Sequence, residues 1–141
     1  MSIQDLESQH TSGLYTKRPI AIVRGEGARL WDSDGHEYID CVGGQGAGNL
    51  GHGNAAVADA LAAQARTLIA CPEMFYNDKR AQLLDKLIRI APPGLQRAYL
   101  CNSGTEAVEA AFKFAWVKTG CREVVAAMRG FHGRTMGALS A

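Results

Sequence analysis

Hydrophobic and polar residues alternate with the two-residue period of β-strands in the N-terminal third of the chain. A β-branched run at 20–23 precedes an Arg-Gly-Glu-Gly turn signal, and residues 28–31 then alternate in polarity. A second turn signal at 32–35, Asp-Ser-Asp-Gly, leads into another alternating segment at 37–40. Short alternating segments separated by glycine-containing turns are typical of an antiparallel sheet. We therefore predict a small meander, preceded over 1–18 by an arm or a short helix.

A glycine-rich stretch and two helical patterns follow the predicted meander. Six glycines lie within residues 41–53, which predicts a loop whose backbone closely approaches another group. Asn54 favours the start of a helix, and apolar residues recur at helical spacing from there to about Ala70. A second amphipathic helix is predicted from about 78 to 91, where Pro92-Pro93-Gly94 ends it.

The pattern changes again in the C-terminal third of the chain. Residues 97–101 and 123–128 are short apolar runs typical of buried strands, and the segment between them, 106–119, has the pattern of a helix. A strand, a helix and a strand within about thirty residues form the βαβ unit of a parallel sheet. We therefore predict an α/β fold whose parallel sheet begins in this third.

Length and composition suit a small globular domain with its own core. The chain has 141 residues, of which 47% are hydrophobic and 21% are charged. Two strands, however, cannot make a parallel sheet that is covered on both faces. We therefore expect part of a larger domain. Its arm, meander and glycine-rich loop occupy 1–53, a helical segment occupies 54–95, and the incomplete sheet domain begins over 96–141.

Charge and cysteine content argue against several classes of protein. The net charge of +1 gives no attraction for nucleic acid or an anionic membrane, and no apolar run reaches transmembrane length. The polar N-terminus does not resemble a secretory signal, so we expect a cytoplasmic protein. Four isolated cysteines disfavour a structural zinc site and favour reduced, buried thiols: Cys41, Cys71, Cys101 and Cys121.

The first candidate for chemistry lies between the predicted strand and helix, and we call residues 102–105 the phosphate loop. Ser103 and Glu106 have the spacing of a capping box, so a helix begins here. The free N–H groups and the positive end of that helix favour an anion. Gly104 lets a phosphate reach the backbone, and the hydroxyls of Ser103 and Thr105 add hydrogen-bond donors. The alternative is a plain helix cap.

The second candidate follows the next predicted strand, and we call residues 130–135 the ring loop. Loops at the carboxyl ends of parallel strands lie on one edge of the sheet, where open α/β folds bind ligands. Phe131, flanked by Gly130 and another glycine, could stack on a planar ring. Arg134 could take a substrate carboxylate through paired hydrogen bonds. In isolation, a core phenylalanine and a surface arginine explain these residues better, and it is the flanking glycines opposite an anion loop that favour a site.

Together the two loops resemble the paired signatures of the class III, or ornithine-type, aminotransferases. The matching runs are 103–111 and 131–135, and the segments 24–32 and 49–54 are also similar to that family. The likeness is greatest to acetylornithine aminotransferases and to related enzymes that act on carrier-protein-linked lysine. It implies the N-terminal part of a transferase of fold type I that depends on pyridoxal 5′-phosphate. That part holds the small meander and the start of the large, mostly parallel sheet domain.

The resemblance assigns roles to individual residues. It implies that Gly104 and Thr105 hold the cofactor phosphate, that Phe131 lies against the pyridine ring, and that Arg134 binds the substrate α-carboxylate. Tyr15 falls where ornithine-type members place a substrate-contacting tyrosine. Ser103 either assists the phosphate or only caps the helix. Gln45 stands where relatives often carry an aromatic residue near the substrate, which leaves the substrate subgroup open.

Two functional hypotheses follow from the resemblance. In the first, the protein moves an amino group from N-acetylornithine or a carrier-linked lysine to 2-oxoglutarate, in arginine or lysine biosynthesis. It does so as a homodimer or with a second chain that carries the rest of the domain. The family's Schiff-base lysine lies beyond the region covered here, so none of the five lysines is expected to be catalytic. In the second, a truncated fragment binds phosphate, cofactor or a partner chain without turnover. Ornithine, 4-aminobutyrate and glutamate-semialdehyde chemistry also stay open.

Overall fold

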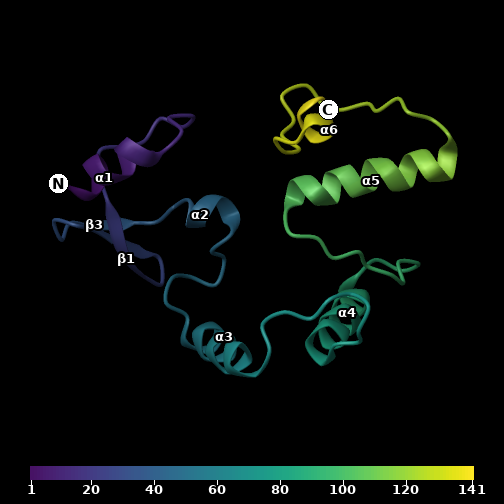
Figure 1. The fold of residues 1–141 in the computed structure, drawn as a ribbon, viewed down its shortest axis with the longest axis horizontal. Helices are drawn as coiled ribbons and strands as arrows, with labels where there is room; N and C mark the ends of the chain where they lie inside the picture. The colour runs from purple at the N-terminus through teal and green to yellow at the C-terminus, as the bar shows by residue number, and fades with distance from the viewer. The chain divides into compact units, whose positions relative to one another are not determined.

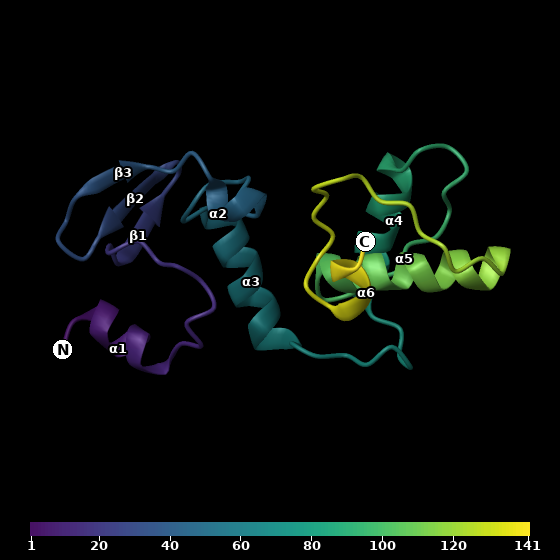
Figure 2. The same cartoon turned by 90° about the horizontal axis from the view of Figure 1, so that it is seen from above.

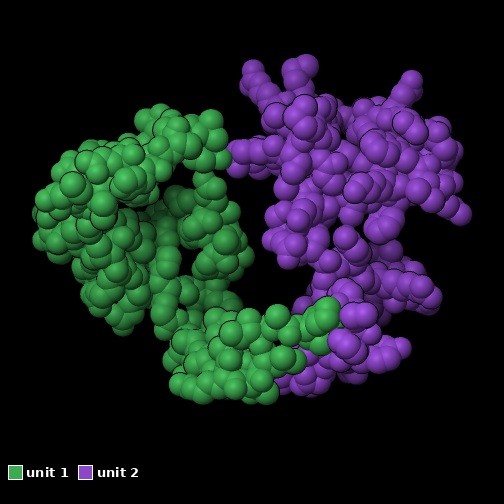
Figure 3. Space-filling model, in the orientation of Figure 1, with its two compact units in different colours: residues 1–72 green, residues 73–141 purple.

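The computed structural model describes all residues from 1 to 141, and they form two compact units (Figures 1 and 3). The first unit comprises 1–72 and the second 73–141. Helices and strands are both present, as an α/β protein requires. None of the helices combines the length and the apolar character needed to cross a membrane.

The first unit begins with a helix and contains the predicted meander. Helix α1 (Ile3–His10) starts at a capping box formed by Ser2 and Asp5. Strands β1 (Ile22–Glu26), β2 (Arg29–Asp32) and β3 (Glu37–Ile39) pair antiparallel in chain order (Figure 2). The meander is therefore confirmed, except that β1 begins and ends later than its β-branched run. Pairing continues through the predicted turn because Glu26 lies opposite Arg29.

The glycine-rich stretch folds back on the meander and then enters a helix. Residues Gly43–Gly46 form a short helical segment, α2, in which Gln45 has the left-handed φ of 60°. The stretch is held to the sheet at Gly27, whose N–H and C=O both bond the backbone of His52 at 2.9 Å. Helix α3 (Ala55–Thr67) begins where predicted, because the Asn54 side chain accepts the N–H of its third residue at 3.2 Å.

Three helices make up the regular structure of the second unit. Helix α4 (Asp78–Ile90) starts at the N-cap Asn77 and ends before the two prolines, as predicted. Helix α5 (Gly104–Thr119) is capped by Ser103 and ends at Gly120. Gly120 has a φ of 74°, the left-handed conformation with which many helices end. Helix α6 (Met136–Leu139) is a single turn directly after the ring loop.

The two strands predicted around α5 do not form, and that prediction is wrong for the described chain. Residues 97–101 and 123–128 pair with no strand. Parallel strands are stable only within a sheet that holds them side by side, and the crossover helix α5 alone does not provide that sheet. The helix between these runs forms from local hydrogen bonds alone, which is why α5 is present without a sheet.

A single apolar core does not form either, contrary to the expectation from length and composition. The buried apolar residues are Ala21 in the first unit and Ala138 in the second. Large apolar side chains of both predicted strands are exposed, for example Val125 at 99%. The cysteines are also not buried: Cys71 is half-buried, and Cys41, Cys101 and Cys121 are exposed. Both departures share one reason, since the apolar faces lack the packed layer that would cover them.

Candidate cofactor site

The phosphate loop and the ring loop meet in the second unit although Phe131 lies 26 positions after Thr105. The two loops line a common hollow of about 480 Å³. Volumes of this order hold small ligands and cofactors. Helix α5 and the ring loop contribute its walls: Gly104, Thr105, Val108, Phe131, His132, Gly133 and Arg134.

The phosphate loop presents the N-terminus of α5 to this hollow. Ser103 Oγ accepts the N–H of Glu106 at 3.3 Å, which satisfies one unpaired amide of the first turn. The predicted capping box is only half correct, because the Glu106 carboxylate bonds the N–H of Asn102 at 2.6 Å instead of that of Ser103. A Cβ added to Gly104 would have no neighbour within 4 Å. The backbone at Gly104 is therefore open to a ligand, as the anion-site prediction requires.

The ring loop exposes an aromatic face beside that helix end. Phe131 is 71% exposed, so its ring is not a core side chain in the described chain. The guanidinium carbon of Arg134 lies 5.0 Å from the centroid of the Phe131 ring, within the range of a cation–π contact. The loop lies closely against α5 at Gly133, where a Cβ would overlap the hydroxyl of Thr105.

Glu109 connects the two loops, and the sequence prediction did not include it. Its Oε1 accepts the hydroxyl of Thr135 at 2.6 Å and the N–H groups of Gly137 and Ala138 at 2.9 and 3.1 Å. The hydroxyl of Thr135 also lies 2.8 Å from that of Thr105. These bonds lower the pKa of Glu109, most strongly through the hydroxyl of Thr135. One sequence signal was available, since residues 105 and 109 share a helix face.

The predicted site residues are thus divided between the units. Gly104, Thr105, Phe131 and Arg134 line one hollow in the second unit, and Ser103 caps the helix beside it. Tyr15 belongs to the first unit, where it is 56% exposed. None of the five lysines lines the hollow.

A carboxylate and a histidine hold the glycine-rich stretch of the first unit. His52 Nε2 lies 2.7 Å from Asp40 Oδ2, and Asp40 Oδ1 accepts the N–H groups of Val42 and Gly43 at 3.0 and 2.8 Å. These bonds lower the pKa of Asp40, chiefly through His52. Gly25 permits the contact, because a Cβ there would lie 2.6 Å from the imidazole carbon Cγ.

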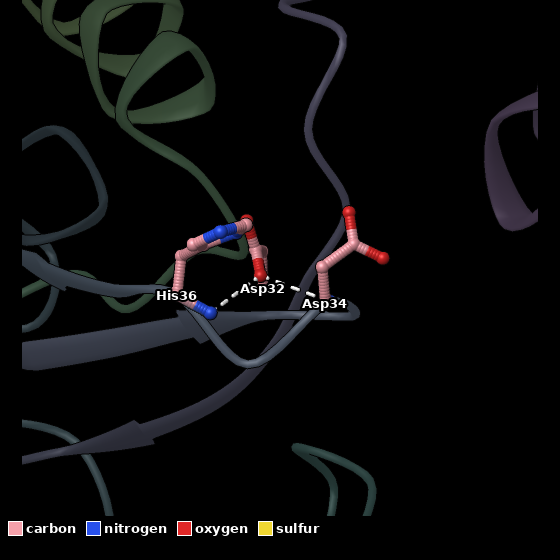
Figure 4. A group of neighbouring side chains, drawn as sticks. All are labelled: Asp32, Asp34 and His36. Carbon is pink, nitrogen blue, oxygen red and sulfur yellow. Dashed lines mark hydrogen bonds and ion pairs between the residues drawn. The ribbon is translucent and has the colours of Figure 1, made fainter.

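Asp32, Asp34 and His36 form a second polar cluster, at the turn between β2 and β3 (Figure 4). The Asp32 carboxylate is buried, and its Oδ1 accepts the N–H groups of Asp34 and His36 at 2.9 Å each. Its Oδ2 accepts the hydroxyl of Tyr38 at 2.7 Å and faces His36 Nδ1 at 3.1 Å. Hydrogen bonds within the turn therefore use both oxygens of the Asp32 carboxylate.

Comparison with known proteins agrees with the geometry of the second unit. Residues 12–141 match the family described as aminotransferase class-III. The chain belongs to this family. The match includes both loops that line the hollow, and it also covers the meander and the glycine-rich stretch.

Two curated relatives in this family are similar along most of the chain. The [LysW]-aminoadipate semialdehyde transaminase of Deinococcus radiodurans is 49% identical over 134 residues, which are 95% of this chain and 31% of that protein. The acetylornithine aminotransferase of Methanopyrus kandleri is 45% identical over 141 residues, which are 100% of this chain and 36% of that protein. The chain thus spans about a third of the length of these relatives.

A solved aminotransferase structure has a similar fold. The taurine:2-oxoglutarate aminotransferase of Bifidobacterium kashiwanohense, solved in complex with PLP and glutamate, aligns with a TM-score of 0.88. It is 28% identical, and the alignment covers 94% of this chain and 31% of that one. The predicted fold type and the resemblance to the class III aminotransferases are therefore confirmed.

Proposed function

We propose that this chain forms the phosphate and ring contacts of a pyridoxal 5′-phosphate site in an aminotransferase. One observation carries the proposal: the end of α5 and the ring loop line a single hollow although they are distant in sequence. A helix N-terminus suits the phosphate, and an exposed aromatic beside it suits a planar heterocycle. Membership of the class III family supports the same assignment.

The residues of the hollow fit this cofactor. The backbone N–H groups at Gly104 and Thr105 would bind the phosphate, since a Cβ at Gly104 would have no neighbour within 4 Å. The 71% exposed ring of Phe131 would lie against the pyridine. Arg134, on the same loop, would pair with the α-carboxylate of the substrate and so orient it in the site. The bound cofactor would supply an electron sink for the charge that develops at the carbon carrying the transferred amino group.

The names of the relatives support a substrate class. These relatives are named for acetylornithine and for [LysW]-aminoadipate semialdehyde, so we propose N-acetylornithine or a carrier-protein-linked lysine as donor. We propose 2-oxoglutarate as the acceptor, in arginine or lysine biosynthesis. Tyr15 is proposed to contact the substrate in the assembled protein.

We also propose that the protein acts as a homodimer or together with a further segment of the domain. The segment Met74-Phe75-Tyr76 supports an interface, because these residues are 81%, 60% and 106% exposed. Exposed groups of large apolar and aromatic side chains commonly mark contact surfaces. Sedimentation of the intact protein distinguishes a dimer from a monomer.

The second candidate is binding of phosphate or cofactor without turnover. Borohydride reduction of the intact protein with pyridoxal 5′-phosphate, followed by peptide mapping, separates the two. An aminotransferase leaves the reduced cofactor on one specific lysine, and transfers an amino group from the donor in a half-reaction. A binding fragment retains the cofactor without any stable adduct, which would contradict the aminotransferase assignment.

A further inference from the structure

A chain of two hydroxyl groups and a carboxylate links the phosphate loop to the ring loop. Thr105 is the second residue of α5, Glu109 is one turn further along the helix, and Thr135 ends the ring loop. The hydroxyl oxygens of Thr105 and Thr135 are 2.8 Å apart, and that of Thr135 is 2.6 Å from Glu109 Oε1. No backbone–backbone hydrogen bond joins the two loops, so this series of side-chain hydrogen bonds is their main polar link.

The chemistry of these three groups fixes the direction of each hydrogen bond. An ionised carboxylate only accepts, and a hydroxyl has one proton to donate. Thr135 must therefore donate its proton to Glu109. The 2.8 Å contact between the hydroxyls is then donated by Thr105, whose single proton points to Thr135. Glu109 is ionised at neutral pH, and these hydrogen bonds lower its pKa further.

We infer that Glu109 is a positioning residue that holds the ring loop on α5. Its carboxylate accepts the hydroxyl proton of Thr135, and the hydroxyl of Thr135 therefore accepts that of Thr105. Glu109 also accepts the N–H groups of Gly137 and Ala138, so the same oxygen caps the turn that follows the loop. The position of Phe131 relative to the end of α5 is set by these contacts. The roles of the two loops rest on the proposed cofactor site, whereas the hydrogen bonds are independent of it.

The direction of these hydrogen bonds changes the role assigned to Thr105. A phosphate dianion binds through donors, and the hydroxyl proton of Thr105 is already committed to Thr135. Thr105 therefore contributes its backbone N–H to the phosphate, while its side chain ties the loops together. The sequence prediction, in which this hydroxyl is a further phosphate donor, requires the proton to point the other way.

Two glycines make room for the link. A Cβ at Gly133 would overlap the Thr105 hydroxyl, and a Cβ at Gly137 would lie 2.5 Å from Glu109 Oε2. A larger residue at Gly133 would move the loop away from α5, and one at Gly137 would displace the Glu109 carboxylate. Both glycines therefore leave room for the same series of hydrogen bonds, although they lie on opposite sides of Thr135.

The test measures binding of pyridoxine 5′-phosphate to the intact protein by titration calorimetry. This probe has the ring and the phosphate but no aldehyde, so it cannot bond covalently to a lysine. Inorganic phosphate is the second probe, because it lacks the ring. The variants are T105V, T135V and their double variant, with T135S to restore the hydroxyl. T119V is the matched control, since Thr119 also makes hydroxyl hydrogen bonds on α5 but at its far end.

We expect T105V and T135V each to weaken binding of pyridoxine 5′-phosphate about five- to tenfold. The double variant should be no weaker than either single variant, because both remove the same link. T135S and T119V should bind within about twofold of the unchanged protein. Additive losses, or a loss of inorganic phosphate binding in T105V alone, would show that Thr105 donates to the phosphate and would overturn the inference.

Glu109 is tested by hydrogen–deuterium exchange without any ligand. We expect E109A to speed exchange of the amides at 137 and 138 about tenfold, and E109Q to keep most of the protection. Glutamine retains one carbonyl oxygen, and a single oxygen accepts all three bonds. Equal exchange in E109A and the unchanged protein would refute the positioning role. If the unchanged protein binds neither probe, the proposed function fails, and exchange alone decides the inference.

Discussion

Substitution of Gly133 by alanine should separate the ring loop from α5 and weaken cofactor binding. Gly133 has a φ of +139°, a conformation that residues with a Cβ rarely adopt. The added methyl group would also overlap the side chain of Thr105 and lie 3.1 Å from the Cβ of Ala138. The loop must therefore change its backbone conformation and move away from the helix.

Two contributions set the expected magnitude. Holding a residue with a Cβ at such a φ costs about 2 kcal/mol. Moving the loop breaks the hydrogen bond between the hydroxyls of Thr105 and Thr135, which is worth about 1 kcal/mol. The overlap would add to the cost of returning the loop to its binding position, so the sum of these two contributions is a lower limit. The sum of about 3 kcal/mol corresponds to a loss of affinity of roughly a hundredfold.

The assay is calorimetric binding of pyridoxine 5′-phosphate, with urea unfolding as the control for folding. G94A provides the matched variant, because Gly94 has a φ of +94° but no atom within 4 Å of an added Cβ. We expect G94A to lose about 1–2 kcal/mol of unfolding free energy and to bind the probe within about threefold of the unchanged protein. Binding by G133A within about fivefold would refute the proposed contact between the loop and the phosphate helix.

Three further predictions concern the first unit. N54A should lower the free energy of unfolding by about 1 kcal/mol in urea, and N54D should restore it; no loss would mean that the N-cap of α3 contributes nothing. Hydrogen bonds, chiefly from the hydroxyl of Tyr38, lower the pKa of Asp32 to about 2. The stability that the ionised Asp32 carboxylate contributes should therefore be complete above about pH 4 and decline as the pH falls towards 2. D32N should flatten this part of the acid-unfolding curve, and an unchanged curve would contradict the assignment. G25A should displace the imidazole of His52 and speed proteolysis within residues 43–53, and unchanged cleavage would contradict the contact.

Features that depend on neighbours in sequence were predictable. The meander follows from alternating residues and turn signals, and the helices α3, α4 and α5 begin at Asn54, Asn77 and Ser103, each of which accepts an N–H three residues on. The two loops of the site were predicted because each follows an apolar run, and the structure places them at one hollow. Bringing the two loops together requires helix α5 and the ring loop beside it, but not the two strands predicted at 97–101 and 123–128.

Features that depend on distant residues were not predictable from the pattern. Glu109 and Thr135 are 26 positions apart, and nothing local in the sequence indicates that Glu109 caps the turn that follows Thr135. The runs at 97–101 and 123–128 have the composition of strands, but composition does not supply the neighbours that parallel pairing requires. The exposed state of Cys101 and Cys121 follows from the same missing neighbours.

The most direct test of the cofactor site is a crystal structure of the intact protein with pyridoxine 5′-phosphate. The account predicts phosphate oxygens within hydrogen-bond distance of the backbone N–H groups at Gly104 and Thr105. It also predicts the pyridine ring against Phe131 and the Thr105 hydroxyl still directed to Thr135. Phosphate bound away from the first turn of α5, or a ring that does not touch Phe131, would contradict it.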